Sequence, residues 1–279
     1  MNYTFKNIAV FFDDTNAGLI TVELAAQVAS TFQSRLICAC ATLDPQLKQS
    51  SSFAKGQAIA QVIQEQKEKK DRTIRQLTEK VRELSDKYHI CAEFRDIYRL
   101  QNISHDKNKI FYCDLAIASI PHLPGVPLDD SPERMLLRAG VPILITPSTW
   151  QNAHIGKKIV VAWNESRVAR RAISDAMPFL TQAQSVMVLC VNPDPSTGDG
   201  EPGHELAGYL RHHGVDAHVK LTDANQKTVA QTIHDESLAF GADLLIVGAY
   251  SHSRLSERLL GGTTRFLLEH VSLPLFISH

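Results

Sequence analysis

The sequence repeats itself, and this repeat limits the folds that the chain can adopt. The segment KNIAVFFDDTNAGLITVELAAQVASTFQSRLICACATLDP, which begins at Lys6, matches in order and spacing KKIVVAWNESRVARRAISDAMPFLTQAQSVMVLCVNPDP, which begins at Lys157. Further along, DLAIASIPHLP and GVPILITP correspond to DLLIVGAYSHS and SLPLFISH. The repeat predicts two copies of one structural unit.

The expected boundary lies where PSTWQNAHIG supplies the proline, glycine and polar residues of a linker. We therefore expect one unit over residues 1–148 and a second over 157–279. Each copy alternates β-branched runs with alanine-rich amphipathic stretches, which predicts βαβ units around a parallel sheet. Runs such as LLIVG lack polar alternation, as do strands covered on both faces. The predicted fold is α/β, with two tandem Rossmann-like units, each a five-stranded parallel sheet with helices on both faces.

The second copy allows its elements to be placed in detail. We expect strands in KIVVAW, SVMVLCV, DAHVKL, LLIVGA and PLFIS. The helices are expected to begin near Ser166, Gly203, Thr228 and Gly262. Just before the helix expected near Gly203, the stretch NPDPSTGDGEPG predicts a mobile loop.

The first copy contains an additional helix. Apolar residues recur at spacings of three, four and three among Glu, Lys and Arg, which indicates an amphipathic helix of several turns. They are Ile74, Leu77, Val81 and Leu84. We expect the apolar stripe to pack on the sheet; the alternative, a coiled coil with a partner, would need more heptads than are present.

Composition excludes several classes of partner. The 29 Lys and Arg residues balance 30 Asp and Glu residues, so no net field attracts nucleic acid or anionic lipid. No apolar run approaches the roughly 20 residues that span a bilayer, and the N-terminus shows no signal-peptide pattern. We expect a cytoplasmic protein that binds neither nucleic acid nor membranes. The five cysteines include no CxxC pair and are expected to be buried and reduced.

Ligands of open parallel sheets bind at the carboxyl ends of the strands, where the strand order reverses. In the second copy, Asn164, Val191 and Gly248 fall at such ends. The run Gly261-Gly262-Thr263-Thr264 stands where a helix would begin, and free N–H groups there could bind phosphate, with the threonine hydroxyls as further donors. The same residues are equally suited to a plain turn and helix cap. Walker A and GxGxxG patterns are absent.

These residues resemble the universal stress protein family, and the resemblance covers nearly all of both copies. It implies a pair of adenine nucleotide alpha hydrolase-like domains. Nucleotide-binding members carry Gly-x2-Gly-x9-Gly-[Ser/Thr] after the fourth strand. Gly248, Ser251, Gly261 and Gly262 fall on its four positions, with the spacer HSRLSERLL intact. Asn164 stands where an Asp lies near the adenosine, and Val191 where a backbone contact to adenine is expected.

The resemblance implies ATP or another adenine nucleotide as the ligand, with Mg²⁺ as its companion ion. This chain departs from the family pattern at two of its four positions. Ser251 brings a Cβ to a glycine position, and Gly262 lacks the hydroxyl that would contact phosphate, although Thr263 follows it. We therefore expect weak or altered nucleotide binding. His252 flanks the same site and is a candidate contact to a polyphosphate.

The first copy keeps Asp13 after its first strand, but IPHLPGVPLDDSPERMLLRAG replaces the glycine pattern. We interpret this copy as a structural, pseudo-dimeric partner and Asp13 as a turn and helix-cap residue. Homodimers are a further option, because members of the family pair through their last strands. Four histidines gather in the second copy, but their spacing fits no standard zinc site. They are His204, His212, His213 and His218.

Two functions stay open at this point. The chain is a universal stress protein whose second copy binds an adenine nucleotide, with at most slow ATP hydrolysis. Alternatively, it is a scaffold or small-molecule carrier of the same fold that binds no nucleotide. No convergent set of acid, base and nucleophile indicates a dedicated enzyme, and Ser251 beside His252 lacks a GxSxG elbow.

Overall fold

The computed structural model describes residues 3–40, 56–96, 112–120, 140–147, 149–150, 152, 154–193, 202–249, 262–270 and 272–279. The first copy supplies β1 (Asn7–Phe12), β2 (Arg35–Cys40), β3 (Ala92–Asp96), β4 (Leu115–Ile120) and β5 (Ile143–Pro147). The second supplies β6 (Lys158–Ala162), β7 (Ser185–Val191), β8 (Ala217–Thr222), β9 (Leu244–Gly248) and β10 (Leu275–Ser278). All five strands predicted for the second copy are confirmed.

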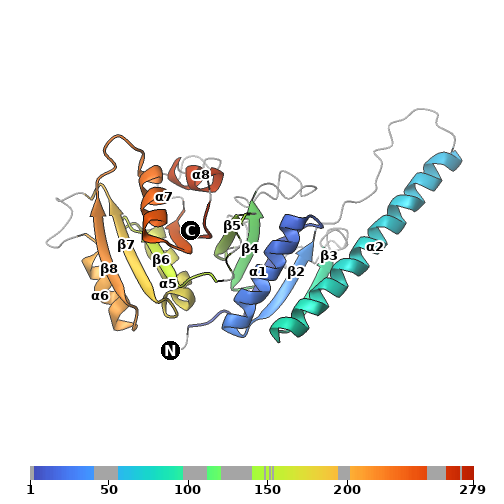
Figure 1. Ribbon diagram of the computed structural model, residues 1–279, viewed down its shortest axis with the longest axis horizontal. Helices are drawn as coiled ribbons and strands as arrows, with labels where there is room; N and C mark the ends of the chain where they lie inside the picture. Colours follow the sequence, from blue (N-terminus) through green and yellow to red (C-terminus); the bar gives the residue numbers. More distant parts are fainter. Residues whose placement is uncertain are drawn as a thin grey trace.

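These strands form one continuous sheet in the order β3-β2-β1-β4-β5-β10-β9-β6-β7-β8 (Figure 1). Within each copy all neighbouring strands run parallel, as predicted. The copies meet where β5 and β10 pair antiparallel, with Leu144 opposite Phe276. We call this strand pair the seam. The last strand of each copy therefore finds its partner inside the chain.

The described helices cover both faces of this sheet. They are α1 (Asn16–Phe32), α2 (Gly56–Tyr88), α5 (Arg167–Leu180), α6 (His204–His212), α7 (Val229–Phe240) and α8 (Gly262–Glu269). Side chains of α1, α2, α5 and α6 join one core cluster, and those of α7 and α8 join the cluster on the other face. The α/β fold with helices on both faces is confirmed.

Helix starts in the second copy fall at the predicted residues. Ser166, Gly203 and Thr228 are the N-caps of α5, α6 and α7, and α8 begins at Gly262. Thr228 forms a capping box with Gln231, in which each side chain bonds the other residue's backbone N–H. Hydroxyl caps satisfy donors that the first turn leaves free, so these short sequence signals locate the helix starts.

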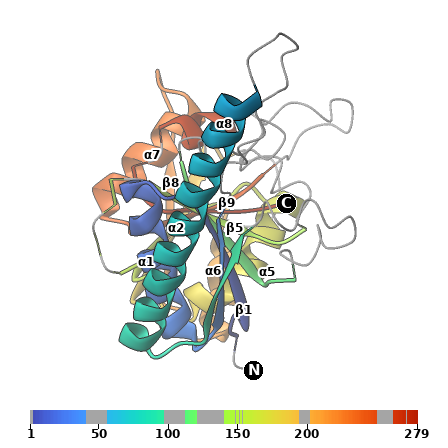
Figure 2. The same ribbon diagram turned by 90° about the vertical axis from the view of Figure 1, so that its right-hand side faces the viewer.

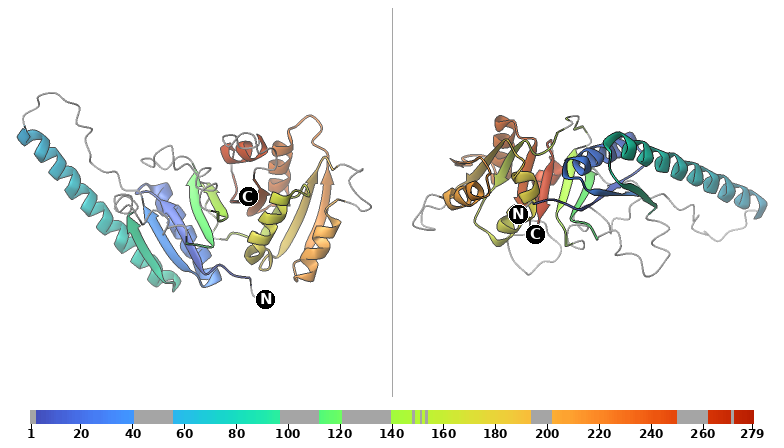
Figure 3. Two further views of the ribbon diagram at one scale, coloured as in Figure 1. Left: turned by 180° about the vertical axis from the view of Figure 1, so that it is seen from behind. Right: turned by 90° about the horizontal axis from the view of Figure 1, so that it is seen from below.

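The additional helix α2 is long and extends away from the sheet, as Figures 2 and 3 show. Leu77, Val81 and Leu84 are buried against the first copy, and Ile74 is half-buried. The predicted apolar stripe is thus on the sheet. Residues 64–69 of the same helix are exposed.

An aromatic cluster joins the two copies beside the seam. Phe179 of α5 packs edge-on against Phe32 of α1, with ring centroids 5.0 Å apart. Phe5 lies 5.5 Å and Phe276 of β10 lies 6.1 Å from Phe179. Aromatic pairs in such geometry add to the energy of burying the rings. The copies therefore share one hydrophobic core on this face.

Each copy also fixes the start of its first strand with an aspartate. Asp114 accepts hydrogen bonds from the backbone N–H groups of Lys6 and Asn7, at 2.7 and 2.8 Å. Asp243 accepts three, from residues 156, 157 and 158, at 3.0 to 3.1 Å. These aspartates open the DLAIAS and DLLIVG runs. The repeat thus extends to a structural contact that the sequence pattern did not suggest.

The cysteines need one correction. Cys38, Cys40, Cys113 and Cys190 are buried and free, as expected. Cys91 is exposed, because it lies between α2 and the start of β3 rather than within a covered strand.

Candidate functional site

The site predicted in the second copy lies along the edge of the sheet that is formed by the carboxyl ends of its strands. In the strand order, β6 lies between β9 and β7. Gly248 ends β9, Asn164 follows β6 and Val191 ends β7. These three residues therefore follow three neighbouring parallel strands. After β6 the chain forms β7 on one side of β6, and later it forms β9 on the other side. The strand order therefore reverses between β6 and β9, and open α/β sheets bind ligands at such a position.

Asn164 shapes the turn from β6 into α5. Its Oδ1 accepts hydrogen bonds from the backbone N–H of Ser166, at 3.3 Å, and from the Ser166 hydroxyl, at 2.7 Å. The Ser166 hydroxyl oxygen accepts in turn from the N–H of Ala169, at 3.2 Å. The Asn164 side chain is exposed. The turn thus uses Oδ1 as a hydrogen-bond acceptor, and the side-chain NH2 group of Asn164 lies at the edge of the sheet.

The first copy builds the same turn with an aspartate. The Asp13 carboxylate accepts from the N–H and the hydroxyl of Thr15, which caps α1 by accepting from the N–H of Gly18. Asp13 is buried, with 8% of its surface exposed. The geometry agrees with the interpretation of Asp13 as a turn residue that supports a helix cap.

Gly248 is needed for packing. A Cβ at this position would lie 2.4 Å from the backbone nitrogen of Ala169 and 2.5 Å from the carbonyl carbon of Val168. The first turn of α5 therefore packs directly on the end of β9. In the first copy the equivalent residue is Ser119, which has a side chain. Gly248 thus has a structural role that its match to a phosphate-binding pattern does not reveal.

Val191 is half-buried at the end of β7, next to a residue that ties β7 to β8. Asn192 has a left-handed backbone, with φ of 49°. Its N–H donates to the carbonyl of Thr222, at 2.9 Å, and its Oδ1 accepts from the N–H of Ala224, at 2.8 Å. This bracing fixes the backbone at the position proposed to face a base.

The predicted phosphate segment is described from its second glycine onward. Gly262 and Thr263 are exposed in the first turn of α8, whereas Thr264 is buried, with 5% of its surface exposed. A Cβ at Gly262 would meet no atom within 4 Å. Ser251, His252 and Gly261 lie outside the described residues. The same is true of residues 194–201, which are the central part of the predicted mobile loop, and of the segment 121–139.

The two copies differ in charge at the corresponding edges. In the first copy, burial raises the pKa of Cys40 to about 12, with further contributions from Asp14, Asp96 and Asp13. Three carboxylates thus surround the end of β2. By the repeat and strand registers, Asn164, Glu165 and Leu221 take the places of Asp13, Asp14 and Asp96. One acidic group replaces three, so the second copy repels an anionic ligand less.

Asp96 was missed by the sequence interpretation, although its position at the end of a short strand could have indicated it. It is buried and lies 3.8 Å from Lys70 of α2. The additional helix thus places a basic group at the edge of the first copy. In the second copy, burial and the nearby Glu165 carboxylate raise the pKa of Cys190 to about 11, so this thiol is neutral at pH 7.

The histidines that the sequence brings together lie on α6 and next to it. His204 begins α6, His212 ends it and both are exposed, while His213 packs against Tyr3 and Tyr209. Across the described ranges, no group of three or more His, Cys, Asp or Glu side chains is arranged to hold a metal ion. Within the same ranges, no helix has both the length and the apolar character needed to cross a bilayer.

Comparison with known proteins addresses the second copy directly. Residues 156–279 match the model of the universal stress protein family. No curated protein matches the sequence. Among solved structures, a universal stress protein from Archaeoglobus fulgidus DSM 4304 is similar over 97% of both chains, with 15% identity and a TM-score of 0.63. A protein of unknown function from Pseudomonas aeruginosa PAO1 has 16% identity and a TM-score of 0.54, over 98% of this chain and 92% of its own.

These similarities extend the family's fold beyond the matched region. The Archaeoglobus universal stress protein aligns over nearly the whole chain, including the first copy. At this level of identity the likeness concerns the fold. The fold of this chain is therefore shared, over nearly its whole length, with a universal stress protein of known structure.

Proposed function

We propose that the chain is a tandem universal stress protein whose second copy binds an adenine nucleotide at the edge formed by β9, β6 and β7. The observation that carries this proposal is the convergence of Gly248, Asn164 and Val191 on three neighbouring strand ends. The nucleoside would lie near Asn164 and Val191, and the phosphates near the start of α8. Helix N-termini favour phosphate through free N–H groups and the helix dipole.

The charge difference between the copies supports this choice of copy. Three carboxylates at the edge of the first copy oppose a polyphosphate, whereas the second copy keeps Glu165 as the corresponding acidic group. Mg²⁺ bound to the nucleotide would reduce the remaining repulsion. The chain's role would be a response to nucleotide level rather than rapid turnover, because the described edge holds no nucleophile paired with a base.

Calorimetry tests the proposal. ATP, ADP and AMP are titrated into the full chain with Mg²⁺, and micromolar or weaker binding is expected. Gly261→Arg should abolish it by placing a bulky side chain in the phosphate segment. Gly208→Arg is the matched control, because a Cβ at Gly208 meets no atom within 4 Å on α6. Absence of heat with all three nucleotides at millimolar concentration would refute the nucleotide function and leave the scaffold or carrier alternative.

A further inference from the structure

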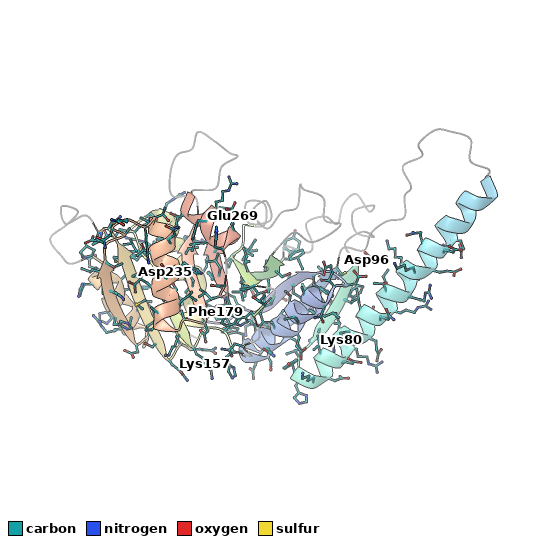
Figure 4. All side chains as sticks on the ribbon, turned by 45° about the horizontal axis from the view of Figure 1, so that its top comes forward. Lys80, Asp96, Lys157, Phe179, Asp235 and Glu269 are labelled. Atoms are coloured by element: carbon teal, nitrogen blue, oxygen red, sulfur yellow. The ribbon has the colours of Figure 1, made fainter. Side chains whose placement is uncertain are left out.

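A cavity lies beside the seam, away from the edge that holds the candidate nucleotide site. Its volume is about 150 Å³. Five apolar side chains line it: Leu24, Val28, Phe32, Ile155 and Phe179. The first three belong to α1 of the first copy, Ile155 lies in the linker, and Phe179 belongs to α5 of the second copy. We call this the seam cavity. Figure 4 shows Phe179 and Lys157 at the junction between the copies, next to α1.

The inner wall of the seam cavity is rigid and aromatic. Phe32 and Phe179 are 5% and 3% exposed, and their rings are perpendicular to one another. Gly156, with φ of 88°, also lines the cavity, and a Cβ there would lie 2.8 Å from the Phe179 ring. Its N–H is held by Asp243. The wall that a ligand would contact is therefore fixed before binding.

The rim of the seam cavity is polar and basic. Thr31, His154, Lys157 and Gln182 are exposed and line the opening. None of the described residues that line the cavity is acidic. Asp243, which holds the N–H of Gly156, accepts from three backbone N–H groups and does not line the cavity. Lys157 thus lines an apolar hollow with no carboxylate among the lining residues.

We propose that the seam cavity binds a small aromatic carboxylate. An engineered apolar cavity of about 150 Å³ accepts benzene, so a single ring fits this volume. A ring placed here would add an edge-to-face partner to Phe32 and Phe179. Its carboxylate would lie at the rim, where Lys157 donates a charge-assisted hydrogen bond. Both copies contribute to the wall, so an occupied cavity links α1 to α5 and stabilises the seam.

Benzoate and its neutral relative benzyl alcohol serve as probes, in calorimetry and in heteronuclear NMR of the full chain. The wild type should bind benzoate more tightly than benzyl alcohol and show shifts of the Gly156 amide and the Phe32 and Phe179 ring signals. Lys157→Met should weaken benzoate about fivefold and leave benzyl alcohol unchanged. Lys158→Met is the matched control, since this neighbouring lysine lies outside the cavity lining and should leave both unchanged.

Thr31→Phe places a ring over the opening from an exposed position and should abolish binding of both probes while the circular dichroism spectrum is retained. Saturating ATP should not compete with benzoate, which separates this proposal from the nucleotide function. Failure of the wild type to bind either probe would overturn the proposal. Equal effects of Lys157→Met and Lys158→Met, or shifts confined to other regions, would overturn it as well.

Discussion

The backbone nitrogen of Ala169 lies so close to Gly248 that a Cβ atom on the glycine would be 2.4 Å away. Gly248 ends β9, and Ala169 lies in the first turn of α5. Because the obstructing atoms belong to the backbone, no side-chain rotation can relieve the contact. The glycine therefore sets how closely α5 approaches the sheet, and with it the position of the Asn164 turn that precedes this helix.

Gly248→Ala should lower the free energy of unfolding by about 2 kcal/mol, the usual cost of forcing extra volume into a packed contact. Urea unfolding followed by circular dichroism measures it. Gly262→Ala is the control, because its Cβ would meet no atom within 4 Å and should change stability by less than about 1 kcal/mol. Equal stability of the two variants would contradict a tight contact between α5 and β9.

Asp243 provides a second test of what holds the second copy together. Asp243→Ala leaves the N–H groups of residues 156, 157 and 158 without their acceptor, in a site where the aspartate is 8% exposed. A hydrogen bond to a charged group contributes about 1.5–3 kcal/mol, so the loss of three such bonds should lower the free energy of unfolding by at least about 3 kcal/mol, even where water replaces part of the bonding. Thermal unfolding by calorimetry gives the value.

The control for Asp243 is Asp235→Ala on α7, where the carboxylate forms an exposed ion pair with Lys227. Exposed pairs contribute about 0–1 kcal/mol, so this change should be small. If the Asp243 variant were no less stable than the Asp235 variant, the three backbone bonds would not be important for the start of β6.

The fold could be predicted to a large extent because its signals are local. Ser166 and Thr228 mark helix starts, since a hydroxyl cap needs only the following three residues. The stripe formed by Leu77, Val81 and Leu84 likewise depends only on helical spacing. The cap at Ser166 recurs as Thr15 in the first copy, so the internal repeat made a prediction for one copy informative about the other.

Contacts between distant segments could not be predicted in the same way. The clash that a Cβ at Gly248 would cause depends on α5, which lies about 80 residues earlier in the chain. The sequence does not indicate whether a glycine in a motif leaves room for a phosphate or for a helix. The family resemblance pointed to pairing through the last strands, but the seam cavity requires the relative placement of both copies. Asp96 was overlooked because its neighbours at the sheet edge, Asp13 and Asp14, are distant in sequence.

The cysteines should react at very different rates. Burial, with a smaller contribution from nearby carboxylates, raises the pKa of Cys40 to about 12 and that of Cys190 to about 11. Almost no thiolate is therefore present at these two residues at pH 8. Cys91 is exposed. Iodoacetamide at pH 8 should therefore label Cys91 first, as peptide mass spectrometry would show. In urea all five should react alike, and fast labelling of Cys40 in the folded chain would contradict its burial.

Gly262 offers a gain-of-function test that depends on the proposed nucleotide site. The residue is exposed at the start of α8 with free space around it, so Gly262→Ser can add the hydroxyl that the family pattern places there without disturbing the helix. One additional hydrogen bond of about 1 kcal/mol corresponds to roughly fivefold tighter ATP binding. Gly262→Ala makes the same backbone change without the hydroxyl and should bind like the wild type. Equal affinity of the serine and alanine variants would place the phosphates away from this turn.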